Sequence, residues 1–248
     1  MMWLPTIAFS PLVKIPFLFS GTYLAVTAQS PPNPPPKPEE SKKFDGHKDT
    51  MVPPVIMRNG VKIQNAIYWF NFLCEASVII ATQHPTPLSS SILSAISLHP
   101  SGAEHVSATP IWLTGCTLMH LGSFIRLSCY RALGKNFTWE LSVKQGQTLV
   151  TSGPYAVVRH PSYVGALTIY TGVLLTIFGS GSWFSECIGW DTLASKLFTG
   201  VCASWALGIP MMLMGRVNQE DDVLRREFGE KWEAYAERVP YRLFPYIY

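Results

Sequence analysis

Long apolar blocks separated by short polar segments dominate the chain. A helix that spans a membrane needs about 20 mainly apolar residues. Blocks of this length cover residues 63–82, 110–130, 162–185 and 197–215, and a further apolar block covers residues 1–29. The pattern predicts about five transmembrane helices. The last two are close enough to form a helical hairpin, with a short connection around residues 186–191.

The first block leaves two interpretations open. Residues 1–29 carry a single charge, Lys14, and several prolines. They can form a kinked first span, or a signal-like segment, because 25-AVTA-28 loosely resembles a small-residue cleavage site. Residues 30–60 read as a proline-rich, charged linker, and residues 61–248 as the membrane domain. The part 31-PPNPPPKPEESKK-43 has little to bury and is expected to be mobile.

Composition supports a membrane protein and excludes some other classes. The 248 residues are 48% hydrophobic and 14% charged, whereas soluble domains carry about 25% charge. We therefore predict an all-α integral membrane protein. A net charge of only +3 gives no sign of a nucleic-acid surface. The five cysteines show no C-x-x-C pairing, so neither a disulfide framework nor a zinc site is expected, and no metal is predicted.

Lysine and arginine are distributed unevenly between the loops. The loop from residue 83 to 109 contains neither, whereas 37–62 and 131–159 carry several of these residues and the C-terminal tail is rich in arginine. The positive-inside rule places these basic regions together on the cytosolic side. The two polar segments with the most unusual chemistry, 131–165 and 216–248, are therefore predicted to meet on one membrane face.

The first of these segments contains 153-GPYAVVRHPSYVG-165, directly before an uncharged block. Gly-Pro is a turn signal. Pro161 disfavours helical geometry at His160 and suits the first turn of the helix that follows. Free N–H groups at that helix start favour an anionic ligand group. Isolated Tyr and Arg residues are also typical of an interfacial belt, but a belt does not explain this order of residues.

The second segment is 216-RVNQEDDVLRREFGEKWEAYAERVPYRLFP-245. Arg216 and Glu220 are four residues apart and so share one helical face. Gly229 and its charged neighbours predict a break near Phe228, then a short helix that ends before Pro240. An amphipathic interfacial helix is the alternative interpretation. The position of Arg216 and Glu220 at headgroup depth favours a functional role.

Together, 147-QTLVTSGPYAVVRHPSYVG-165 and residues 216–245 resemble the isoprenylcysteine carboxyl methyltransferase family. The resemblance is specific from about Gly134 to the C-terminus and weak before residue 110. It implies a multi-pass membrane enzyme of the endoplasmic reticulum whose active site faces the cytosol. It also implies methylation, with S-adenosylmethionine, of the C-terminal carboxylate of prenylated cysteine in CaaX-type proteins. Prenylated protein C-termini and membrane lipid are the implied partners.

The resemblance also implies a set of site residues. The family commonly has His where Gln147 stands, and the second acid after Glu220 is Asp221 here, so the upstream contacts are less well defined. Arg216 is the implied catalytic and substrate-binding residue, at the carboxylate position. The implied cofactor contacts are Gln147, Leu149, Val150, Tyr155, His160, Pro161, Ser162, Tyr163 and Glu220.

The chemistry agrees with such a site and leaves three alternatives. A terminal carboxylate has a pKa of about 3.3–3.7, so it is ionised at neutral pH and needs no general base. Arg216 can hold it through its forked, permanently charged guanidinium. A phospholipid N-methyltransferase would need a base for its amine. A sterol-type membrane reductase shares an R-H-P-x-Y pattern but needs a nicotinamide cofactor. A non-catalytic membrane scaffold is the third alternative.

Overall fold

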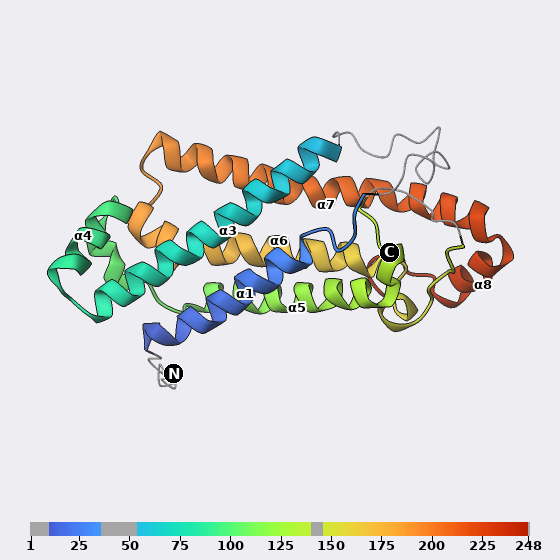
Figure 1. The fold of residues 1–248 in the computed structure, drawn as a ribbon, viewed down its shortest axis with the longest axis horizontal. Helices are drawn as coiled ribbons and strands as arrows, with labels where there is room; N and C mark the ends of the chain where they lie inside the picture. Colours follow the sequence, from blue (N-terminus) through green and yellow to red (C-terminus); the bar gives the residue numbers. More distant parts are fainter. Residues whose placement is uncertain (1–9, 36–53, 140–145, 248) are drawn as a thin grey trace.

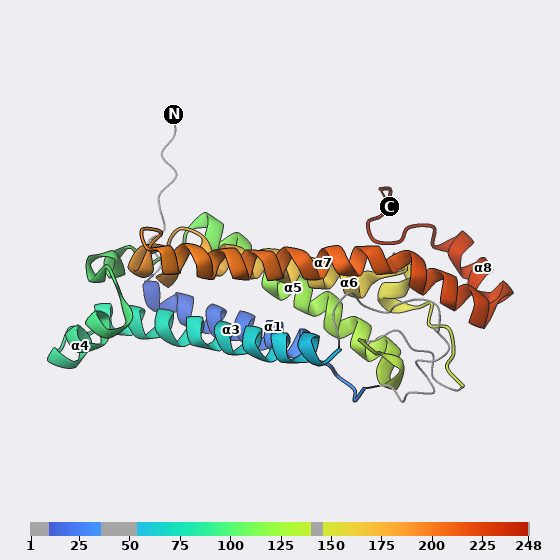
Figure 2. The ribbon, with the colours of Figure 1, turned by 90° about the horizontal axis from the view of Figure 1, so that it is seen from above.

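The computed structural model describes residues 10–35, 54–139 and 146–247. These residues form an elongated helical bundle without strands in the described ranges (Figure 1). Helices α5 and α6 lie at its centre, with α1 and α3 on one side and α7 on the other (Figure 2). The helices are α1 (Lys14–Ala28), α3 (Pro54–Gln83), α4 (Pro87–Ile96), α5 (Pro110–Leu133), α6 (Pro161–Phe178), α7 (Leu193–Phe228) and α8 (Glu230–Arg238).

The predicted spans are helical, with changed boundaries. Three described helices are long and apolar enough to cross a membrane: Pro11–Ala28 with its leading turn, Pro161–Phe178 and Leu193–Phe228. Segments 63–82 and 110–130 lie inside α3 and α5. The all-α class and the presence of membrane-spanning candidates are confirmed. Residues 1–9 lie outside the described ranges.

The expectation of a fourth span over 162–185 is wrong at its end. Helix α6 stops at Phe178, and a short π-helical turn, Phe184–Ile188, precedes α7. Gly181 has a φ of 82°, a backbone conformation that residues other than glycine rarely adopt. The absence of charge beyond Phe178 could not reveal this turn, because an uncharged run does not distinguish helix from buried turn.

Part of the predicted linker is also packed. Helix α3 begins at Pro54, inside the range 30–60. The side-chain amide of Asn33 donates to the backbone oxygens of Gly134 and Phe137, both at 2.9 Å. Asn33 is therefore tied to the chain that follows α5, a contact that the proline-rich composition did not predict. Residues 36–53, where most of the predicted mobility falls, lie outside the described ranges.

Glycines allow α5 and α6 to pack closely. A methyl group on Gly122 would lie 2.7 Å from the backbone oxygen of Gly165, and one on Gly115 would lie 2.8 Å from that of Gly172. Both helices carry their glycines seven residues apart, on one face. Small residues of this kind let membrane helices approach at backbone distance. The central pair of the bundle depends on this contact.

Gly122→Ala is expected to destabilise the protein by about 1–3 kcal/mol, because the added methyl must push the two backbones apart. Gly208→Ala is the matched control, since a methyl there meets nothing within 4 Å. That control should stabilise by about 0.4–1 kcal/mol through the unfolded chain. Thermal unfolding in detergent checks both. Equal midpoints for the two variants would contradict the packing argument.

A buried ion pair joins three parts of the bundle at the far end of α6. The Nζ atom of Lys14 lies 2.7 Å from Oε1 of Glu75 and also donates to the backbone oxygen of Gly181 at 2.7 Å. The backbone N–H of Trp183 donates to Oε2 of Glu75 at 2.9 Å. The two charges inside apolar blocks thus pair with each other. They connect α1 and α3 to the α6–α7 connection.

Candidate active site

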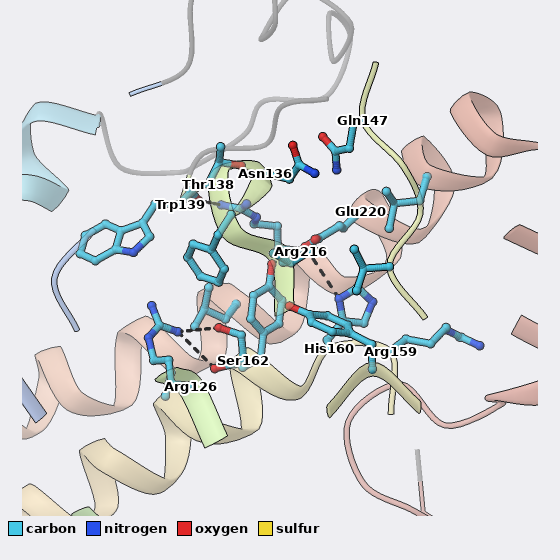
Figure 3. A pocket seen from close by; sticks show the side chains of 18 of the residues that line it. Arg126, Asn136, Thr138, Trp139, Gln147, Arg159, His160, Ser162, Arg216 and Glu220 are labelled. Atoms are coloured by element: carbon cyan, nitrogen blue, oxygen red, sulfur yellow. Dashed lines mark hydrogen bonds and ion pairs between the residues drawn. The ribbon is translucent and has the colours of Figure 1, made fainter. Parts of the chain in front are cut away.

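The predicted site residues meet around one cavity of about 180 Å³, at the end of α6 opposite the ion pair. The cavity has a polar half, lined by Gln147, His160, Arg216 and Glu220 among others (Figure 3). Its apolar half lies between α3 and α7. Pro161 is the one predicted residue that does not line it; it is the first residue of α6. The predicted residues that line it are Gln147, Leu149, Val150, Tyr155, His160, Ser162, Tyr163, Arg216 and Glu220.

The segment before α6 has the geometry that its prolines predict. Gly153 has a φ of 61° and opens a short 3-10 turn to Ala156. His160 caps α6 on non-helical backbone, with φ −124° and ψ 56°. The backbone N–H of His160 donates to the backbone oxygen of Arg242 at 2.9 Å. The backbone N–H of Arg159 donates to the backbone oxygen of Tyr241 at 3.0 Å. The C-terminal tail therefore runs alongside this segment and holds it extended.

The break after α7 also occurs where the sequence predicts it. Helix α7 ends at Phe228, Gly229 has a φ of 52°, and α8 runs from Glu230 to Arg238. This turn folds α8 back beside the end of α7 (Figure 1). The hydroxyl of Tyr235 on α8 donates to the backbone oxygen of Tyr155 at 2.8 Å. Helix α8 therefore covers one side of the cavity.

Two adjacent acids on α7 point in different directions. Glu220 lines the cavity and accepts a hydrogen bond from the hydroxyl of Tyr163 at 2.5 Å. Asp221 is only 4% exposed. Its carboxylate lies 3.0 Å from Nη2 of Arg159, 3.0 Å from Nε2 of His160 and 3.3 Å from Nε of Arg242. Asp221 thus connects α7 to the 159–160 segment and to the C-terminal tail.

This contact fixes the orientation of His160. A carboxylate can only accept, so Nε2 of His160 carries the proton that Asp221 receives. Nδ1 then lies on the cavity side, 3.8 Å from Oε2 of Glu220. The rings of His160 and Tyr163 are stacked, with centroids 5.4 Å apart. The sequence analysis noted Asp221 only as the second acid after Glu220. It did not predict that Asp221 joins α7 to the 159–160 segment and to the C-terminal tail.

Arg216 lies one turn before Glu220 and faces the same cavity, as their spacing predicts. The residue is 7% exposed. Its Nη1 donates to the backbone oxygen of Trp139 at 2.7 Å (Figure 3). This bond ties α7 to the chain that follows α5 and limits the positions that the guanidinium can take.

The sequence analysis missed several residues of the wall. Arg126 on α5 donates from Nη1 to the backbone oxygen and the hydroxyl of Ser162, at 3.1 and 3.0 Å. A signal for it existed, because an ionisable residue inside a predicted span is a functional candidate. No comparable signal marked the others, which include Asn136, Thr138 and Trp139 near the polar half and Met57, Val61, Ile209, Met212 and Leu213 in the apolar half.

The phenols at the cavity are neutral donors. Burial raises the pKa of Tyr155 well above its ordinary value. Burial also raises the pKa of Tyr235 to about 12. In the described part of the chain, no group of three or more His, Cys, Asp or Glu residues is arranged to hold a metal ion.

The described residues thus form an all-helical bundle with membrane-spanning candidates and one cavity that has a charged part and an apolar part. Residues 114–200 match the sequence profile of the isoprenylcysteine carboxyl methyltransferase (ICMT) family. The human protein-S-isoprenylcysteine O-methyltransferase is 33% identical over 140 residues, which cover 55% of this chain and 42% of that relative. Protein-S-isoprenylcysteine O-methyltransferase B of Arabidopsis thaliana is 27% identical over 133 residues, which cover 52% of this chain and 58% of that relative. The resemblance inferred from the motifs is confirmed.

A second group of relatives shares the same region. A Delta(14)-sterol reductase of Methylotuvimicrobium alcaliphilum is 29% identical over 160 residues, which cover 58% of this chain and 33% of that protein. A mouse Delta(14)-sterol reductase is 28% identical over 103 residues, which cover 42% of this chain and 20% of that protein. The chain thus spans less than half the length of the human methyltransferase and of these reductases.

Proposed function

We propose that this protein is an S-adenosylmethionine-dependent methyltransferase that acts on the C-terminal carboxylate of prenylated cysteine in CaaX-type proteins. One observation carries the proposal. A single cavity combines a charged half, with Arg216 and Glu220 one turn apart, and an apolar half between α3 and α7. Such a cavity suits a charged, water-soluble cofactor and a lipid-linked substrate that must meet at the membrane interface.

The residues of the polar half fit S-adenosylmethionine. When bound, this cofactor supplies an activated methyl group. The carboxylate of Glu220 can accept from a ribose hydroxyl or an amino group. The stacked rings of His160 and Tyr163 offer an apolar face, and the N-terminus of α6 favours a carboxylate. Gln147, Leu149 and Val150 form the adjoining wall.

Arg216 suits the acceptor carboxylate. Its guanidinium can hold that group without giving up a proton to it, so the carboxylate stays ionised and keeps its nucleophilic lone pairs. The backbone oxygen of Trp139 holds the guanidinium at one corner, which reduces the freedom lost on binding. Alignment of nucleophile and methyl group can lower the barrier by several kcal/mol. The described residues of the site therefore need to supply position rather than a base.

The membrane setting completes the proposal. The basic linker, central loop and tail would face the cytosol under the positive-inside rule, with the protein in the endoplasmic reticulum membrane. The prenyl chain would enter the apolar half laterally, since moving it through water is costly. Prenylated protein C-termini would then be the partners, and membrane lipid the surroundings.

Tyr163→Phe is expected to weaken S-adenosylmethionine binding about two- to tenfold. The change removes the hydroxyl that orients Glu220 and leaves the ring in place. Loss of a hydrogen bond to a charged group costs about 1.5–3 kcal/mol, and only part of this loss reaches the cofactor because Tyr163 acts through Glu220. Titration of the detergent-solubilised protein with the cofactor measures it. Tyr241→Phe serves as the control, because Tyr241 does not line the cavity. Equal affinities for the two variants would contradict the cofactor assignment.

Transfer of labelled methyl from S-adenosylmethionine tests the function itself. The acceptors, offered in parallel, are N-acetyl-S-farnesylcysteine and phosphatidylethanolamine. We expect label on the farnesylcysteine alone. Label on the phospholipid would favour the N-methyltransferase reading.

The sterol-reductase relatives justify a third arm of this experiment. The protein is given a Δ14-unsaturated sterol and a reduced nicotinamide cofactor. Reduction of the sterol, with no methyl transfer in the other arms, would replace the proposed function by that of the second group. Failure in every arm with folded protein would favour a scaffold.

A further inference from the structure

Four polar side chains lie at the deep end of the apolar half: three belong to α3, α6 and α7, and the fourth follows α1. Gln64 on α3 is the centre: its Oε1 accepts from Nε1 of Trp205 on α7 at 2.7 Å and from the hydroxyl of Tyr170 on α6 at 3.0 Å. Its amide nitrogen donates to Oε1 of Gln29, which follows α1. We call Gln29, Gln64, Tyr170 and Trp205 the floor network. Gln29, Gln64 and Tyr170 are at most 5% exposed.

The floor network lies where the cavity wall ends on α3 and α7. On α7 the lining residues begin at Ile209, one turn after Trp205, and on α3 they end at Val61, just before Gln64. Trp205 lies eleven residues before Arg216 in the same helix, a rise of about 16 Å at 1.5 Å per residue. The carboxylate-binding candidate and the floor network thus define the two ends of a channel along α7.

Trp205 fills the gap between α3 and α7. A methyl group on Gly60 would lie 2.2 Å from the Cη2 atom of the Trp205 indole. Only a glycine at this position of α3 allows the ring to reach across from α7. The indole is therefore wedged against the α3 backbone and hydrogen-bonded to Gln64, two contacts that hold it across the channel.

We infer that the floor network limits the length of the prenyl chain, with Trp205 as the residue that sets the limit. The inference rests on the proposed function and adds its specificity. A chain that ends above the floor contacts the apolar residues Ile209, Met212 and Val61. A chain one isoprene unit longer that continues along the channel must displace the indole.

The polar character of the floor adds to this discrimination. A longer chain that enters it separates Trp205 and Tyr170 from Gln64 and leaves those groups buried without partners. The Nε2 atom of Gln29 already has no hydrogen-bond partner in the described ranges. A prenyl chain in contact with this atom would also keep water from accepting its hydrogen bond. Sites reject ligands strongly when buried polar groups are left unpaired. The protein should therefore prefer farnesyl to geranylgeranyl acceptors.

The ratio of kcat/KM for N-acetyl-S-geranylgeranylcysteine over N-acetyl-S-farnesylcysteine tests the inference. Trp205→Ala is expected to raise this ratio at least about tenfold, because even a single methylene changes discrimination about 10- to 200-fold. Trp205→Phe keeps most of the ring and should raise it less. Leu207→Ala is the matched control: Leu207 is an apolar residue of α7, two positions away and 56% exposed, and its loss should leave the ratio unchanged.

Cofactor affinity separates a local effect from misfolding. All three variants should bind S-adenosylmethionine like the parent, because Trp205 and Leu207 do not line the cavity. If Trp205→Ala proves unstable, a rise of the kcat/KM ratio in Trp205→Phe alone still tests the length limit. A ratio that stays the same in both Trp205 variants, with farnesylcysteine methylated, would overturn the length limit and leave the proposed function standing. Absence of methylation of either acceptor by the parent protein would overturn both.

Discussion

Arg216→Ala is expected to lower methyl transfer to a prenylcysteine acceptor about 10- to 150-fold, while S-adenosylmethionine still binds nearly as in the parent. A hydrogen bond to a charged group contributes about 1.5–3 kcal/mol, which gives this range. The separation of the two effects follows from geometry. Arg216 and Glu220 lie one turn apart on the cavity wall, and Glu220 accepts a hydrogen bond from Tyr163.

Two further variants sharpen this prediction. Arg216→Lys keeps the charge but loses the fork that reaches both the acceptor and the backbone oxygen of Trp139, so it should retain partial activity. Arg225→Ala removes an arginine from the same helix that pairs with Glu233 at the surface, with its side chain 61% exposed. That control should keep full turnover. Collapse of cofactor affinity in Arg216→Ala, with acceptor dependence intact, would reverse the roles given to Arg216 and Glu220.

Asp221→Ala is expected to destabilise the folded protein by about 3–5 kcal/mol, because it leaves buried positive charge without its partner. Arg159 has only 9% of its side chain exposed and pairs with Asp221 at 3.0 Å. Nε2 of His160 loses the same carboxylate. The variant should therefore lower the unfolding midpoint and also weaken S-adenosylmethionine binding, since His160 can then turn.

Asp222→Ala is the matched control for this change. Asp222 is the next residue of α7 and is exposed, so its loss should shift the midpoint very little. Asp221→Asn keeps the shape and one acceptor oxygen and should fall between the two alanine variants. A midpoint for Asp221→Ala equal to that of Asp222→Ala would show that the contacts of Asp221 do not hold the C-terminal tail in place.

Local signals in the sequence predicted three features of the candidate site. Pro161 after His160 predicts a helix start, and the spacing of Arg216 and Glu220 predicts a common face. Gly229 predicts the end of α7. Each of these follows from backbone preference or helical periodicity, which depend on neighbours in the chain.

The remaining features depend on contacts between distant segments. The pairing of Lys14 with Glu75, and of Asp221 with Arg242, joins residues that no local pattern connects. Asn33 lies in the proline-rich segment, and its bond to the chain after α5 likewise joins residues far apart in sequence. The end of α6 at Phe178 was hidden because an uncharged turn resembles an uncharged helix. The floor network was hidden in the same way, since Gln64 and Trp205 come from helices far apart in sequence.

The position of both ligands in one structure tests the central claim most directly. The detergent-solubilised protein is examined by cryo-electron microscopy with S-adenosylhomocysteine and N-acetyl-S-farnesylcysteine. The account predicts the adenosyl group beside Tyr163 and Glu220, the cysteine carboxylate at Arg216, and the farnesyl chain between α3 and α7, ending above Trp205. Density for either ligand outside this cavity, or a carboxylate away from Arg216, would contradict it.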